Sequence, residues 1–204
     1  FVGVANFNSG ASLADLRFAL AGNQLLDEYA SIRSTAANKT SFFAGGYLYG
    51  DSEEPWGVII HGSFNDSEIR IIGQDGDFQH VKFEQIAVDG NGTIFALGTD
   101  IDGYAYLLSL NGNGDILWDD FIYLGQATDG NTRLLLSPDE KTLYAAVEKS
   151  LYKLTINGEA VGTEFVFTSG ISDIAIGNDG SLVVVTDDAK LHRMSTQGNL
   201  AETS

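Results

Sequence analysis

The sequence predicts an all-β chain: a β-propeller of about five sequential four-stranded blades. Three observations lead to this prediction. One segment recurs along the chain, the stretches between its copies have strand-like apolar patterns, and Asn/Gly and Asp/Gly turns separate them. Each copy of such a repeat buries its faces only against its neighbours, so the period decides the architecture.

The repeat is clearest in residues 86–94, which match residues 174–182 in apolar spacing, turn and closing glycine. Residues 134–143 are the same unit with one extra turn residue. We take as equivalent positions Leu16, Ile69, Tyr106, Leu151 and Leu191. Their intervals are close to the roughly 40 to 50 residues of a propeller blade, whereas leucine-rich and hexapeptide solenoids have much shorter periods.

The turns divide the chain into a single domain, 1–204, with blades at about 1–35, 41–84, 85–126, 131–168 and 171–204. Gly92 and Gly180 close tight hairpins that need positive φ, so we expect them to be hard to replace. Residues 12–30 fit a helix less well than strands, because residues 21–23 interrupt them like a turn. The first blade lacks an innermost strand, since residues 2–7 already occupy the second position. Either the chain continues before its first residue, as part of a larger propeller, or another molecule covers this edge.

Residues 86–98 and 108–118 resemble bacterial propeller repeats, in particular quinoprotein-like repeats and SBBP (seven-bladed β-propeller) repeats. The last blade is also similar to an NHL repeat, and the resemblance covers about residues 84–200. These families include enzymes, scaffolds and adhesins, so the resemblance implies a fold more than a function. Quinoprotein-like repeats carry a tryptophan after the glycine turn of each blade. Here only Trp118 fills that position, and the other copies have Asp27, Lys82, Thr163 or Ala201 nearby, which argues against a quinone-binding redox enzyme.

Charge and composition exclude several classes of function. The chain has 28 acidic and 11 basic residues, a formal net charge of -17, and no cysteine. Such a surface repels phosphate backbones and anionic lipids, so we expect no nucleic-acid partner. No apolar run approaches the roughly 18 residues that cross a bilayer, so we expect no membrane insertion. Disulfides, thiolate metal sites and cysteine nucleophiles are excluded.

Acidic residues on the propeller loops are the candidate metal ligands. The loops that join second to third strands and one blade to the next share a face, which is predicted to carry Asp66, Glu68, Asp100, Asp102, Asp129, Asp187 and Asp188. Within this set, Asp100 and Asp102 are the candidate ligands of a Ca²⁺ ion, which takes oxygen donors. The segment lacks the full acidic spacing of a calcium loop, so a solvated hairpin turn is the favoured interpretation, and no other cofactor is expected. The opposite face is predicted to carry Asp51, Glu53, Glu54, Asp139 and Glu140.

No other motif carries chemistry. His61, His80 and His192 have no ligand spacing and are assigned structural or surface roles. Neither a phosphate-binding loop nor a serine-hydrolase elbow occurs. Trp56 and Trp118 can stack on a sugar ring or pack between sheets.

We therefore predict a non-catalytic extracellular or cell-surface module for binding or assembly, with a protein partner or self-association. The alternative is a secreted carbohydrate-active enzyme with acids at the propeller channel and a glycan substrate.

Overall fold

The computed structural model of the chain describes residues 30–49, 54–65, 69–73, 78–128, 131–177, 179–195 and 200–203, and these ranges contain strands and turns but no helix. The strands form four sheets. The first sheet contains β1 (Ala30–Ala37), β2 (Ser41–Tyr49), β3 (Pro55–Ser63) and β4 (Ile69–Ile72), and the second contains β5 (Val81–Val88), β6 (Ile94–Asp100), β7 (Tyr104–Leu110) and β8 (Ile122–Gln126). The third contains β9 (Thr132–Leu136), β10 (Thr142–Val147), β11 (Ser150–Thr155) and β12 (Phe165–Val166), and the fourth contains β13 (Ile171–Ile176), β14 (Leu182–Thr186), β15 (Leu191–Met194) and β16 (Leu200–Thr203).

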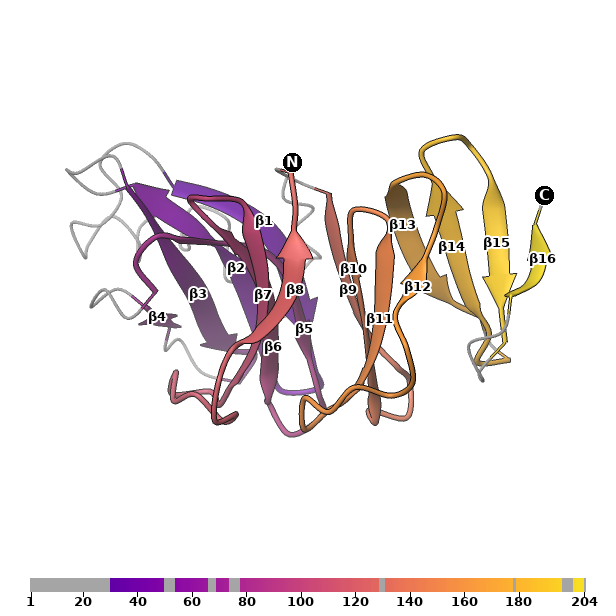
Figure 1. Cartoon of the computed structure of the whole chain (residues 1–204). Helices are drawn as coiled ribbons and strands as arrows, with labels where there is room; N and C mark the ends of the chain where they lie inside the picture. Colours follow the sequence, from indigo (N-terminus) through magenta and orange to yellow (C-terminus); the bar gives the residue numbers. More distant parts are fainter. Residues whose placement is uncertain are drawn as a thin grey trace.

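Each sheet is an antiparallel meander in which the strands pair in chain order. The four sheets stand side by side in the order of the sequence (Figure 1). The first strand of each sheet contacts the first strand of the next, so β1 meets β5, β5 meets β9 and β9 meets β13. This is a propeller-like arrangement of four-stranded blades, which confirms the predicted fold class.

Apolar clusters between consecutive sheets hold the arrangement together, and β6 shows why. Side chains of a strand point alternately to its two faces. Ile94 and Ala96 accordingly belong to the cluster shared with the first sheet, and Phe95 and Leu97 to the cluster shared with the third. Both faces are covered, so the strand is apolar almost throughout. A third cluster joins the third and fourth sheets around Leu151 and Val184.

The hairpin turns have the geometry that the sequence predicts. Gly92 has a φ of 87° and Gly180 a φ of 78°, the left-handed region in which a side chain is strained. In the first of these turns, the Asp89 carboxylate accepts hydrogen bonds from the backbone N–H groups of Asn91 (2.9 Å) and Thr93 (2.7 Å).

The structure divides the N-terminal half differently from the predicted blade boundaries. β1, which the prediction splits from residues 41–84, pairs with β2 along its length, and β5 starts the second sheet at Val81, before the predicted boundary at 85. Ile69 lies in a fourth strand, whereas its assumed equivalents Tyr106, Leu151 and Leu191 lie in third strands. The physical reason is that the true third strand, β3, is not followed by an Asn/Gly turn. The remainder of the predicted first blade, residues 1–29, lies outside the described residues, as does the helix or strand choice there.

Candidate functional site

The acids predicted on the loop face occupy turns between second and third strands. Asp100 is the last residue of β6 and Asp102 lies in the turn that leads to β7, and Asp187 and Asp188 lie between β14 and β15. Asp66, Glu68 and Asp129 lie outside the described residues. The equivalent turn between β10 and β11 carries Glu148, which the sequence analysis did not single out.

Asp100 caps its own turn. One of its carboxylate oxygens accepts hydrogen bonds from the backbone N–H groups of Asp102 (2.9 Å) and Tyr104 (2.8 Å). Asp102 is exposed. Within the described residues, no group of three or more His, Cys, Asp or Glu side chains is arranged to hold a metal ion. The calcium site at Asp100 and Asp102 stays a prediction.

Glu148 fastens the link between the second and third sheets. Its carboxylate accepts hydrogen bonds from the backbone N–H (2.6 Å) and hydroxyl (2.7 Å) of Thr128 and from the side-chain amide of Asn131 (2.8 Å). Partial burial acts to raise the pKa of Glu148, but the hydrogen bonds from Thr128 and Asn131 outweigh it, so the pKa is lowered. Asp187 makes its hydrogen bond within the fourth sheet, where its carboxylate accepts from the hydroxyl of Ser172 on β13 (2.5 Å). We call Asp100, Glu148 and Asp187 the loop acids.

Two further acids of the fourth sheet are paired with bases. Asp188 lies 2.6 Å from the Lys190 ammonium and accepts a hydrogen bond from the Thr186 hydroxyl. Asp179 pairs with Arg193. The hydroxyl and backbone N–H of Ser181, together with Arg193, lower the pKa of Asp179 to about 2.

Of the acids predicted on the opposite face, two lie at the expected end of the sheets and one does not. Asp139 and Glu140 lie in the turn between β9 and β10, at the expected end of the sheets. Glu54 immediately precedes β3, so it belongs to the same end as Asp100, and its predicted placement is wrong. The shift of strand assignment in the first sheet explains this error. Asp51 and Glu53 lie outside the described residues.

The three histidines lie apart from one another in the fold. The His61 ring stacks on Phe43, with centroids 4.5 Å apart, and His192 is buried beside Phe167 with its Nε2 3.2 Å from the Thr186 hydroxyl. His80 lies 3.4 Å from the Glu54 carboxylate.

The innermost strands carry two ion pairs that cross from sheet to sheet. Glu84 on β5 is only 3% exposed and lies 2.8 Å from the Arg33 guanidinium on β1. Asp173 on β13 lies 3.6 Å from Arg133 on β9. Both carboxylates therefore face a base on the neighbouring sheet. Only Glu84 is buried, so Arg33 offsets a charge that would be costly to bury alone, whereas Asp173 is exposed and its pair with Arg133 is a surface contact.

Trp118 lies between the second and third sheets. Its ring centroid is 6.0 Å from that of Phe95, and its Nε1 donates a hydrogen bond to the Ile156 carbonyl (3.1 Å). Gly158, which packs against the indole, has a φ of 86°, a conformation that favours glycine, and a Cβ there would lie 2.9 Å from Ile122 Cδ1 and 3.3 Å from the ring. The interpretation of Trp118 as a residue that packs between sheets accounts for these contacts. Trp56 lies on β3 and forms an isolated bridge with Gln79.

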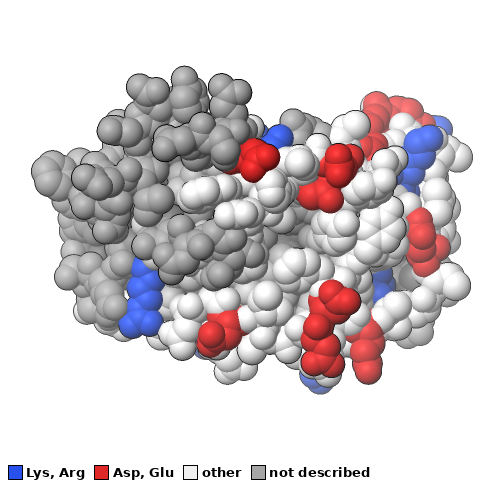
Figure 2. Space-filling view, turned by 60° about the vertical axis from the view of Figure 1, so that its left-hand side comes forward, with Lys and Arg blue, Asp and Glu red and all other residues white. Residues whose placement is uncertain are grey.

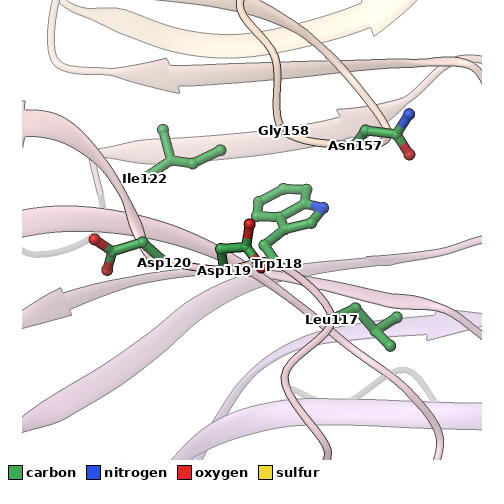
Figure 3. A pocket seen from close by; sticks show the side chains of 7 residues that line it. All are labelled: Leu117, Trp118, Asp119, Asp120, Ile122, Asn157 and Gly158. Carbon is green, nitrogen blue, oxygen red and sulfur yellow. The ribbon is translucent and has the colours of Figure 1, made fainter.

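A groove of about 350 Å³ opens beside Trp118. One wall comes from the segment that leads into β8 and from β8 itself, and the other from the turn after β11 (Figure 3). The lining residues are Leu117, Trp118, Asp119, Asp120, Ile122, Asn157 and Gly158. In Figure 3 the indole points toward the turn that carries Asn157 and Gly158.

The two carboxylates of this groove differ from the loop acids. Asp119 and Asp120 are exposed. One oxygen of Asp120 accepts a hydrogen bond from the adjacent Phe121 N–H (2.8 Å). Across the described part of the chain, no base pairs with either carboxylate, and nothing donates a hydrogen bond to Asp119. We call Asp119 and Asp120 the groove acids.

Exposed apolar side chains gather along the same edge of the second sheet. Ile116 (46%), Leu117 (50%), Phe121 (39%) and Tyr123 (56%) are exposed, and they are four of the ten large exposed apolar side chains in the described ranges. Scattered exposed apolar residues need no explanation, but four within eight consecutive residues are a concentration, and we call these four side chains the apolar patch; the Tyr123 ring lies beside Tyr104 and Tyr106. Sequence reasoning missed the patch because apolar runs on both sides of Asp119 and Asp120 are equally compatible with buried strand residues, and only the structure shows that these side chains are exposed.

Comparison with known proteins identifies the fold and nothing finer. No protein-family model matches the chain, and a search of curated proteins finds no similar sequence. A crystal structure of a protein of unknown function from Bacteroides caccae superposes with a TM-score of 0.59 at 10% identity, over 88% of this chain and 62% of that one. Sqt1 from Chaetomium thermophilum superposes with a TM-score of 0.55 at 18% identity, over 84% of this chain and 44% of that one. The chain thus spans less than two thirds of either protein, and at these identities the similarity concerns the fold alone.

Proposed function

We propose that this chain is a non-catalytic propeller module, secreted or at the cell surface, that binds a protein partner or assembles with other copies. The observation that carries the proposal is the edge of the second sheet at residues 116–123. There a groove, an exposed apolar patch and two carboxylates without basic partners lie together. Protein interfaces combine such apolar contact area with a polar rim.

The distribution of acids also favours binding over catalysis. Glycoside cleavage needs two carboxylates that flank a substrate, one of them protonated. The loop acids are occupied by hydrogen bonds, and the innermost carboxylates Glu84 and Asp173 each face an arginine. On the face in Figure 2, acidic side chains are spread out between uncharged ones. The alternative, a carbohydrate-active enzyme, stays open because some acids of the chain lie outside the described residues.

The repeat type and the location rest on the sequence. The quinoprotein-like or SBBP assignment depends on residues 86–98 and 108–118, and the extracellular location depends on that resemblance together with the net charge of -17. No helix among the described residues is long and apolar enough to cross a membrane. Export signals or anchoring segments in the full-length gene product would test the location.

Turnover assays and size analysis test the proposal together. We expect no hydrolysis of any polysaccharide in a broad panel, and binding or self-association in size-exclusion chromatography with electron microscopy. Hydrolysis that disappears on changing a single loop or channel aspartate to asparagine would contradict the proposal in favour of the enzyme.

A further inference from the structure

We propose that the groove at Trp118 binds an arginine-containing, positively charged segment of a partner protein. This inference rests on the proposed binding function and names the chemistry of the partner. It follows from the charge of the groove, from the indole that lines it and from the apolar patch beside it.

The charge of the groove selects a cation. Asp119 and Asp120, both exposed, are the two charged residues of the lining. Among the described residues no Lys or Arg lines the groove. The whole chain carries a net charge of -17, so its field attracts basic partners and repels acidic ones.

The indole selects arginine among cations. Its N–H donates to the Ile156 carbonyl, so the part of the half-buried ring that lines the groove has no hydrogen-bonding group to offer a ligand. A guanidinium can pack against an aromatic ring and at the same time present several donors to carboxylates. Lysine offers a point charge without a planar face, so it exploits only half of this site.

The apolar patch provides contact for the residues around that arginine. Leu117 belongs to both the groove and the patch. Ile116 precedes it in the chain, and Phe121 directly follows the groove acids. Aliphatic side chains of an extended segment would cover these residues. A neutral sugar ring can also stack on tryptophan, but it brings hydroxyl groups and no charge to the two carboxylates, so a basic peptide fits better.

Fluorescence polarisation with labelled peptides tests the inference. The probe is Gly-Leu-Arg-Leu-Arg-Gly, compared with the same peptide carrying citrulline in place of arginine, which keeps the shape and removes the charge. Binding is measured near physiological ionic strength, where the contribution of distant charges is screened beyond about 8 Å. We expect saturable binding of the arginine peptide, and binding about tenfold weaker for the citrulline peptide.

A pair of matched double variants locates the site. Asp119→Asn with Asp120→Asn removes two charges at the groove, and Asp102→Asn with Glu140→Gln removes two exposed charges elsewhere. We expect about tenfold weaker binding for the first and little change for the second. Equal weakening in both, no effect of the groove variant, or no binding of the arginine peptide would overturn the inference.

A glycan array on the same protein separates this inference from the proposed function. Binding of a glycan that Asp119→Asn abolishes, without peptide binding, would overturn the basic-peptide inference and leave the binding function standing. Polysaccharide hydrolysis would instead contradict the binding function itself.

Discussion

The loop acids and the groove acids carry the same chemical group in opposite circumstances. Asp100 receives hydrogen bonds from its own turn, Glu148 from the link between the second and third sheets, and Asp187 from Ser172 on β13. Asp119 and Asp120 stand exposed beside an indole and an apolar patch, without a basic partner in the described residues. In a chain with 28 acids, position on a propeller face says little about function. A carboxylate that already accepts hydrogen bonds from the fold has a structural role, whereas one without such donors or a basic partner is available to a ligand.

The largest expected effect on stability is at Glu148, one of the loop acids. The Glu148 carboxylate accepts three hydrogen bonds, two at one oxygen and one at the other. In Glu148→Gln an NH₂ group replaces one of these oxygens, so at least one of the three donors loses its acceptor. We expect about 2 kcal/mol of destabilisation, because charge-assisted bonds are worth about 1.5 to 3 kcal/mol and solvent screens a half-exposed side chain. Urea unfolding measures it. Asp119→Asn is the control and is expected to change stability by less than about 0.5 kcal/mol.

The same carboxylate predicts a pH dependence with a definite sign. The folded-state pKa of Glu148 is lowered. Its contribution is therefore present above the ordinary glutamate pKa of about 4.3 and is lost as the pH falls through the lower folded-state value. We expect the difference in unfolding free energy between the wild type and Glu148→Gln to shrink over this range. A difference that stays constant down to the lowest pH would mean that the hydrogen bonds to the charged form are not its cause.

A smaller effect is expected at Asp100. Asparagine can accept the two backbone hydrogen bonds of the turn, whereas alanine cannot. We expect Asp100→Ala to destabilise by about 1 kcal/mol and Asp100→Asn to be nearly neutral. Thermal unfolding with both variants distinguishes a turn cap from a charge effect, since a loss in the asparagine variant equal to that in alanine would indicate that the charge is what matters.

The smallest effect concerns calcium. Because one Asp100 oxygen already accepts two N–H groups and no three-acid group surrounds it in the described residues, we expect calcium chloride to leave the unfolding temperature unchanged. A rise in the wild type that is absent in Asp100→Asn would confirm the calcium site predicted from sequence and would place Asp100 among the binding acids.

The second half of the fold could be predicted from sequence because local turn chemistry and strand pattern agree there. Residues 86–94 and 174–182 each place an Asx/Gly turn between two apolar strands, and both form the expected hairpin. The first sheet departs from that pattern, so Ile69 was assigned to the wrong strand and Glu54 to the wrong end.

The groove was beyond sequence reasoning for a different reason. Trp118 could be singled out, and its packing role was one of its two interpretations. Its groove, however, combines residues 117–122 with Asn157 and Gly158 from the next sheet, and no local motif records that pairing. The hydrogen bonds that occupy Glu148 come from a link 17 to 20 residues away, so its role too depends on the stacking of sheets.

One measurement tests directly whether free and occupied acids divide into binding and structural groups. Backbone and indole N–H signals are followed by NMR while the arginine peptide is added. We predict that the Trp118 indole signal and the backbone signals of residues 117–122 and 157–158 shift, while those of the turns at Asp100, Glu148 and Asp187 do not. Shifts confined to these three turns, with the groove signals unchanged, would contradict the account.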